Sequence, residues 1–322
     1  MLKTKELNGA TWMVSKGYPT TDDRAPTTSS KTFEGGGNYG VEIPVINNLD
    51  SLAASLKAIE HHGIKVTRFN ETHGSFLLSD REIGSMLSAC RESGIGITIS
   101  LGPRPEYDIR ASFYRTEFGK SQGRRLNSNH SIRVCCDEAI RLAELGCRGI
   151  IMYDLGVLSV LSEMRAAGQL PASMTFKVSS HCMVTNQYTA RMYVQAGADS
   201  ITTPHDLSVT MLGDMRALNP TVCLDVPIDV YKTKGGYIRF YESANVITAC
   251  SPVMLKLGAS AQDHPYDSIG SSTYAKRIER VARGLEVLNR EMSGHEMVSS
   301  SHPLAAMPTR PGTGDKKDNR WL

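Results

Sequence analysis

The sequence lacks a long apolar run, a block of like charges and a cysteine framework. No stretch of its 322 residues approaches the ~20 apolar residues that span a bilayer, so we expect no membrane partner. The 36 basic and 33 acidic residues are interspersed, and a formal net charge of only +3 disfavours nucleic acid as the main partner. The seven cysteines are odd in number and include no Cys-x-x-Cys pair, which indicates reduced thiols in a cytoplasmic protein.

What the sequence does contain is a repeated unit, in which an amphipathic helix ends at a glycine and a short β-branched strand follows. The unit recurs with Gly63, Gly94, Gly146 and Gly197 at the helix ends. Such strand and helix alternation predicts a parallel sheet buried on both faces. We expect strands near 41–46, 64–70, 96–101, 149–153, 174–179, 199–203, 221–226 and 252–257. Right-handed crossovers then close a single TIM-type (β/α)8 barrel.

The predicted barrel covers 41–293, and two regions flank it. Residues 1–40, rich in Gly, Ser and Thr, predict an N-terminal arm or cap. Residues 294–322 are polar and contain Pro and Gly, which predicts a flexible, mobile C-terminal tail. Within the barrel, the long connection 103–129 after the third strand predicts a lid-like insertion over the substrate.

Several motifs, taken in order, resemble the U32 peptidase-like (collagenase-like) family. The matching pieces lie between 41 and 230 and include 41–45, 48–52, 79–101, the Asp-Leu-Gly-Val element at 154–157, the segment 178–186 and the segment 203–208. The resemblance implies a barrel and a peptidase lineage, some of whose members act in RNA or quinone hydroxylation and carry an iron–sulfur cluster. This sequence departs from the family at 224–228 and at 232–239, where the family's cysteines are missing. We therefore expect no iron–sulfur cluster.

Strand alternation identifies polar side chains that point into the barrel. One face of each strand meets the helices and is apolar, and the other faces the lumen. This rule places Glu42, Arg68, Asn70, Ser100, Asp225 and Lys256 inside, and Asp154 at the end of the fourth strand. Charges in a low-dielectric interior must be paired. The set could be a structural ion-pair layer, or Arg68 and Lys256 could hold an anion while a carboxylate transfers protons.

A second set of candidates follows the strand ends at the catalytic face of the predicted barrel. It comprises Glu71, His73, His181 and His205. The histidines could be general acids and bases, or rim side chains bonded to loop backbone. Alternatively, His181, His205 and Asp225 could bind a divalent metal ion, since two histidines and one carboxylate form a known metal site. In the 103–129 segment, Arg104, Arg110 and Tyr114 could contact an anionic substrate or be ordinary loop side chains.

These patterns predict an enzyme, a hydrolase or lyase that acts on a small polar, anionic substrate. Catalysis would use Glu71, His73, Asp154, His181, His205, Asp225 and Lys256, and the substrate would contact Glu42, Arg68, Asn70, Ser100, Arg104, Arg110 and Tyr114. One alternative is an imine-forming aldolase or lyase that uses Lys256. Another is a non-catalytic ligand-binding barrel or partner subunit. A homo-oligomer is compatible with all of these.

Overall fold

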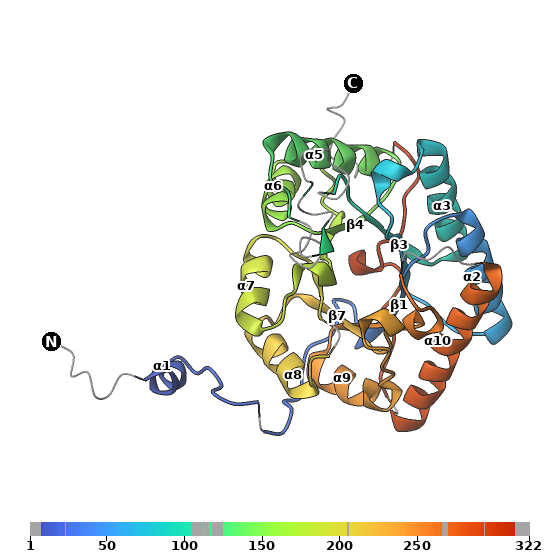
Figure 1. Ribbon diagram of the computed structural model, residues 1–322. Coiled ribbons are helices and arrows are strands. Elements are labelled where there is room, and N and C mark those ends of the chain that lie inside the picture. The colour runs from blue at the N-terminus through green and yellow to red at the C-terminus, as the bar shows by residue number, and fades with distance from the viewer. Residues whose placement is uncertain are drawn as a thin grey trace.

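The fold is a closed barrel of eight parallel strands in the order β1 to β8, as the sequence predicts (Figure 1). The computed structural model describes residues 8–22, 24–104, 112, 116–117, 125–204, 206–265, 270–292 and 294–312. The strands are β1 (Tyr39–Ile43), β2 (Arg68–Asn70), β3 (Gly96–Ser100), β4 (Gly149–Met152), β5 (Thr175–Val178), β6 (Ser200–Thr202), β7 (Cys223–Pro227) and β8 (Val253–Lys256). Each strand lies within a few residues of its predicted position.

A ring of helices surrounds the barrel in the region that the structure describes. These helices are α2 (Leu49–His62), α3 (Asp80–Ser93), α5 (Asn129–Glu144), α6 (Leu155–Ala166), α7 (Gln187–Gln195), α8 (Val209–Leu218), α9 (Ser243–Cys250) and α10 (Ser271–Glu291). A further helix, α1 (Gly9–Ser15), precedes the barrel, and short 3-10 turns include η1 (Ser75–Leu77), η4 (Ser180–Cys182), η5 (Lys232–Lys234), η6 (Phe240–Glu242), η7 (Ala259–Ala261) and η8 (Pro303–Ala305).

Local sequence explains where α3 begins and ends. Ser79 caps its start, because the Ser79 hydroxyl accepts from the Glu82 N–H and the Glu82 carboxylate accepts from the Ser79 N–H at 2.8 Å. At the other end Gly94 adopts a left-handed conformation with φ of 70°, which a residue with a Cβ atom resists. The helix between these signals buries Ile83, Met86, Leu87 and Cys90 against the barrel.

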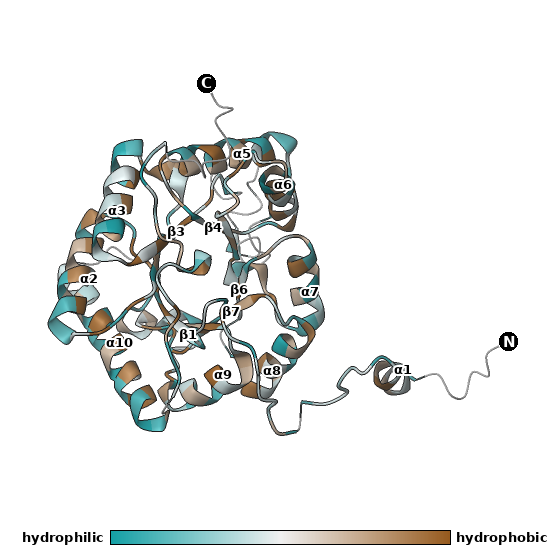
Figure 2. Ribbon diagram, turned by 180° about the vertical axis from the view of Figure 1, so that it is seen from behind, coloured by the Kyte–Doolittle hydropathy of each residue, from teal (hydrophilic) through white to brown (hydrophobic). Residues whose placement is uncertain are grey.

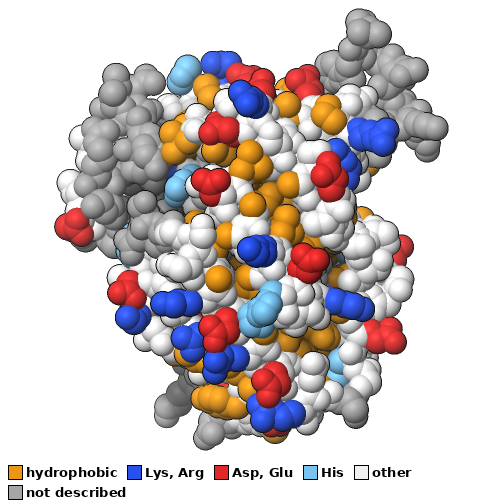
Figure 3. Space-filling view, turned by 90° about the vertical axis from the view of Figure 1, so that its right-hand side faces the viewer, with side chains coloured by type: hydrophobic (Ala, Val, Ile, Leu, Met, Phe, Trp, Pro, Cys, Tyr) orange, Lys and Arg blue, Asp and Glu red, His pale blue; other side chains and the backbone are white. Residues whose placement is uncertain are grey.

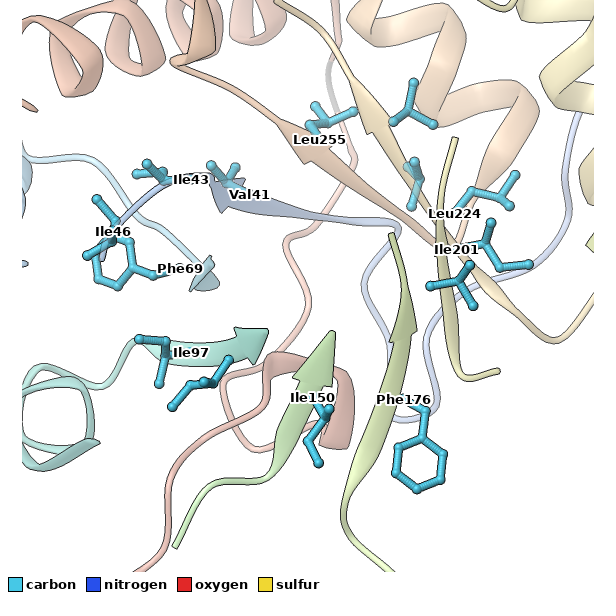
Figure 4. Close-up of a cluster of buried hydrophobic side chains, with 14 of the residues drawn as sticks. Val41, Ile43, Ile46, Phe69, Ile97, Ile150, Phe176, Ile201, Leu224 and Leu255 are labelled. Atoms are coloured by element: carbon cyan, nitrogen blue, oxygen red, sulfur yellow. The ribbon is translucent and has the colours of Figure 1, made fainter. Parts of the chain in front are cut away.

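The main hydrophobic core lies between the strands and the surrounding helices. Labelled side chains such as Ile97, Ile150 and Phe176 point away from the barrel axis (Figure 4), and each is fully buried. The helices are correspondingly apolar toward the strands and polar toward solvent (Figure 2). Outward side chains on every strand are therefore committed to the core, which leaves the inward ones to fill the lumen.

The segment 294–312 closes the amino-terminal end of the barrel and is not a mobile tail. The Val298 N–H donates to the Tyr39 carbonyl at 2.8 Å, and the Ile97 N–H donates to the Ala306 carbonyl at 3.1 Å. A Cβ atom on Gly96 would lie 1.6 Å from the Ala305 carbonyl oxygen, so only glycine allows this close approach. The polar composition of the segment concealed the few apolar side chains that fill the opening, of which Ala305 and Ala306 are fully buried.

Residues 8–40 form an arm and a cap in succession. Helix α1 has no buried residue, and Figure 1 shows it beside the barrel. From Arg24 onward the chain lies against the barrel: Arg24 pairs with Asp214 of α8, and the Ser29 hydroxyl donates to the Ser251 carbonyl at 2.6 Å. Phe33 then packs with Cys223, Met254 and Val298 in a small apolar cluster at the amino-terminal end of the lumen.

The surface carries both signs of charge. On the face shown in Figure 3, basic and acidic side chains alternate and neither sign forms a continuous block. Among the described residues, no helix is both long enough and apolar enough to cross a membrane.

Candidate active site

A cavity opens at the carboxyl ends of the strands, where barrel enzymes place their active sites. The space open to the centres of water molecules is about 80 Å³, several times what one water molecule needs, so a small polar molecule fits. The polar residues of its described lining are Asn70, Thr72, Tyr153, Lys177, Ser179, Ser180, His181, Thr202, Asp229, Tyr231, Lys234 and Lys256, and its apolar residues are Pro44, Val45, Ile151, Pro227, Val230, Ala259 and Pro265.

At the floor of this cavity lies a cluster of five charged side chains, which we call the lumen cluster: Glu42, Arg68, Lys177 and Asp225, which are buried, and Lys256, which is partly exposed. Arg68 joins the two carboxylates, with Nε 2.7 Å from Glu42 Oε2 and Nη2 2.9 Å from Asp225 Oδ1. Lys177 also joins them, contacting Glu42 and lying 2.7 Å from Asp225 Oδ2. Lys256 Nζ lies 2.9 Å from Glu42 Oε1. The strand register accounts for this closeness, because Glu42 is directly opposite Arg68 on one side and Lys256 on the other.

Within the lumen cluster the charges perturb one another strongly. Burial acts to raise the pKa of Glu42, but Lys177, Lys256 and Arg68 together hold that pKa well below its usual range. Burial lowers the pKa of Lys177 to about 8, against the opposing attraction of Asp225 and Glu42. Lys177 therefore loses its proton more readily than an ordinary lysine.

Glu42, Arg68, Asp225 and Lys256 lie together in the lumen, as the sequence predicts, and Lys177 is a fifth member that was not predicted. The alternation of β5 predicts the direction of Lys177: because the apolar side chains of Phe176 and Val178 point outward, the side chain between them points into the lumen. The structure also separates the group by depth. Lys177 and Lys256 line the cavity with Asn70, whereas Glu42, Arg68 and Asp225 lie below it.

One wall of the cavity is built around Tyr153. Its hydroxyl lies 2.9 Å from the Ser100 hydroxyl and accepts an N–H from Arg104 at 3.1 Å. The Arg104 guanidinium also stacks on the Tyr153 ring, 4.7 Å from the ring centre, and donates to the Thr72 carbonyl at 2.6 Å. Arg104 and Ser100 thus fix the position of Tyr153, and the His181 ring lies 6.0 Å from that of Tyr153 on the same wall.

Three predicted catalytic residues lie outside this cavity. Buried Glu71 accepts backbone N–H groups from His73, Gly74 and Ser100, so it holds the loop after β2, and burial raises its pKa. His73 is exposed and does not line the cavity. Asp154 caps α6 by accepting from the Gly156 N–H at 2.8 Å and, through its other oxygen, from the Leu126 N–H at 3.1 Å. The contacts of Glu71 and Asp154 support the architecture of the loops.

Other predicted residues lie outside the part of the chain that the structure describes. These are Arg110, Tyr114 and His205, together with most of the predicted 103–129 lid. The His181, His205 and Asp225 metal site therefore stays a prediction. Within the described residues there is no group of three or more metal-binding side chains, and both Asp225 oxygens already accept hydrogen bonds, from Arg68 and from Ser200 at 3.1 Å.

Comparison with known proteins identifies no family for this chain. No protein-family model matches this chain, and no curated protein matches it in sequence. Its fold is similar to that of "native KDPGal" (13% identity, 77% of this chain and 94% of that one, TM-score 0.45). It is also similar to the U32 peptidase Mk0906 (11% identity, 74% and 96%, TM-score 0.41) and to a 3-deoxy-D-arabino-heptulosonate 7-phosphate synthase from Thermotoga maritima (8% identity, 78% and 88%, TM-score 0.44).

Proposed function

We propose that this barrel is an enzyme that breaks a bond in a small anionic substrate, most simply as a lyase. The observation that carries the proposal is the cavity floor, where Lys177 and Lys256 face the cavity and two buried carboxylates lie behind them. A layer that served only to pair charges would not need two of its lysines on the floor of an open cavity. Coupled, desolvated groups in a cleft are where proton transfer is expected.

The charge of the lining supports an anionic substrate. Lys177, Lys234 and Lys256 contribute positive charge. Among the described lining residues the acidic one is Asp229, and its oxygens are occupied by backbone N–H groups of Gly258 and Ser260, each at 2.7 Å. An entering carboxylate or phosphate therefore meets cations without a competing free carboxylate. In this proposal Lys256 binds the anionic group. Tyr153 and His181 line the cavity and exchange protons with the bound substrate.

Descent from the U32 peptidase-like family is part of the proposal. The segment 178–186, one of the motifs that resemble that family, supplies the cavity wall residues Ser179, Ser180 and His181. The small, lysine-floored cavity suits a small molecule better than a polypeptide, so we favour bond cleavage in a metabolite over peptide hydrolysis. Hydrolysis of a small substrate by the same acid and base groups is the alternative within this proposal.

The test measures binding before turnover. Small carboxylates and phosphates should raise the melting temperature of the purified protein, and their neutral amide analogues should not. Lys256→Met should weaken binding of the best anion roughly 10- to 100-fold, since a charge-assisted hydrogen bond is worth about 1.5–3 kcal/mol. Lys276→Met on the exposed face of α10 is the matched control and should bind normally.

Anions that stabilise the protein are then incubated with it, and their consumption is followed by mass spectrometry. Equal stabilisation by neutral analogues, or unchanged binding in Lys256→Met, would contradict the anion site. Tight binding without any consumption would instead support the non-catalytic ligand-binding alternative.

A further inference from the structure

The surroundings of Lys177 suit a lysine that releases its proton readily. An ammonium has three N–H donors, whereas a neutral amine has two and keeps a lone pair. Among the described residues Lys177 has two acceptors, Glu42 and Asp225. Two N–H groups satisfy both carboxylates, and the remaining direction of the nitrogen is left to the lone pair. Because Lys177 also lines the cavity, that lone pair is available to a molecule bound there.

The charge count of the lumen cluster leads to the same conclusion. Fully protonated, the cluster holds three cations, Arg68, Lys177 and Lys256, against the carboxylates of Glu42 and Asp225. Loss of one proton balances the charges. Arginine does not lose its proton in proteins. Of the two lysines, Lys177 is the more costly to keep charged, because its side chain is 2% exposed and that of Lys256 is 17% exposed.

We propose that Lys177 is a nucleophile that forms an imine with the carbonyl carbon of a small anionic substrate. This inference rests on the proposed function and specifies it: the substrate is an aldehyde or ketone that also carries a carboxylate or phosphate. Lys256 binds the anionic group, and Lys177 attacks the carbonyl. The lysine at the reacting centre is therefore the one on β5, and the sequence-based alternative of an imine at Lys256 is replaced.

The chemistry balances without a further reagent. The amine lone pair forms a C–N bond as the carbonyl π pair moves to oxygen, which takes up a proton. That proton comes from the nitrogen. The nitrogen lone pair then forms the C=N bond as the C–O bond breaks, and the leaving hydroxyl becomes water by taking the second nitrogen proton, which a carboxylate of the lumen cluster relays. One amine and one carbonyl thus yield one imine and one water. A protonated imine then accepts the electron pair of a bond that breaks at the neighbouring carbon, which leaves an enamine.

Thr202 gives the site a partner for the carbonyl oxygen. It lies on β6, next to β5, and its side chain lines the cavity. Its hydroxyl is buried and has no hydrogen-bond partner among the described residues. A buried hydroxyl without a partner costs free energy unless a ligand supplies one. The substrate's oxygen, which becomes the hydroxyl of the carbinolamine before it leaves as water, would be that partner.

The experiment traps the imine. The purified full-length protein is incubated with pyruvate, a small anionic ketone, and sodium cyanoborohydride at pH 7, and its intact mass and peptides are then measured. Reduction leaves a stable adduct equal to pyruvate less one oxygen atom. We expect one adduct, on the peptide that contains Lys177 and not on the peptide that contains the exposed Lys276. Lowering the Lys177 pKa from an ordinary ~10.4 to about 8 raises its neutral amine fraction at pH 7 roughly 10²-fold, and the rate of adduct formation should rise with it.

Lys177→Met should lose this adduct, and Lys276→Met should keep it. An adduct on Lys256 would overturn the proposal, as would the absence of an adduct from every lysine. The proposal would also fail if surface lysines formed adducts as fast as the lysines of the unfolded protein do. If Lys177→Met fails to fold, the peptide map of the protein without substitutions still shows which lysine carries the adduct. Stabilisation by pyruvate without any adduct would remove the imine and leave the anion-binding function standing. Failure of both pyruvate and the wider set of anions to stabilise the protein would remove the proposed function as well.

Discussion

The contacts of the lumen cluster predict a large loss of stability for one substitution and a small change for another, although each removes one charge. Glu42→Gln leaves Arg68, Lys177 and Lys256 with Asp225 as their remaining carboxylate in the cluster. Lys177→Met leaves two cations and two carboxylates. In that variant every carboxylate oxygen keeps a donor: Arg68 and Lys256 remain on Glu42, while Arg68 and Ser200 remain on Asp225.

The sizes follow from burial. Breaking a buried ion pair by removing one partner costs about 3–5 kcal/mol, and Glu42 is fully buried and serves three cations, so we expect a loss near the upper end. With an unfolding entropy of about 2.1 cal/mol/K per residue over this chain, ~5 kcal/mol corresponds to a melting temperature about 7 °C lower. For Lys177→Met we expect a change within about 1.5 kcal/mol, since a side chain of similar length replaces it and no charge is left unpaired.

Melting followed by circular dichroism at pH 7, at one scan rate for all proteins, measures both effects. Lys276→Met on the surface serves as the control for loss of a lysine and should melt with the unmodified protein. A melting temperature for Lys177→Met as low as that of Glu42→Gln would refute the charge count. The same result would remove the reason for treating Lys177 as the member of the cluster that loses its proton first.

Three further predictions concern pH, packing and capping. Folding lowers the Lys177 pKa from an ordinary ~10.4 to about 8, so between these pH values the unfolded chain binds one more proton than the folded protein. The free energy of unfolding of the unmodified protein, relative to that of Lys177→Met, should therefore rise by about 3 kcal/mol from pH 8 to pH 10.5. Urea unfolding measures this difference, and a difference that does not change with pH contradicts the prediction. Gly96→Ala should lower the free energy of unfolding by ~1–3 kcal/mol or more, because its Cβ would lie 1.6 Å from the Ala305 carbonyl oxygen. Gly84→Ala, with open space around it in α3, should raise the free energy of unfolding by about 0.5–1 kcal/mol. Equal effects of the two variants in urea unfolding would show that 294–312 does not pack as described. Ser79→Ala should cost ~1 kcal/mol by the same assay through loss of the α3 cap, and an unchanged midpoint would contradict the capping role.

The barrel itself was predictable from local patterns. Glycine at helix ends and short β-branched runs recur along the chain, and each unit predicts its own strand, as β3 after Gly94 illustrates. The strand alternation rule also placed Glu42, Arg68, Asp225 and Lys256 in the lumen before any contact was known, because a strand buried by helices on one side has only one other face for a charge. Applied to β5 in the same way, it would have found Lys177.

Long-range packing determined the rest. The amino acids of 294–312 are polar on average, and nothing local indicates that Ala305 and Ala306 seal the opening left by Gly96 and Gly149, more than 150 positions away in the chain. Depth within the lumen is likewise a property of the closed barrel: Lys256 and Arg68 both face inward, yet only the first lines the cavity. Glu71 holds its loop because folding brings the backbone N–H groups of Gly74 and Ser100 within reach of its carboxylate. The spacing of a residue in the sequence specifies the direction of its side chain but not its hydrogen-bond partners.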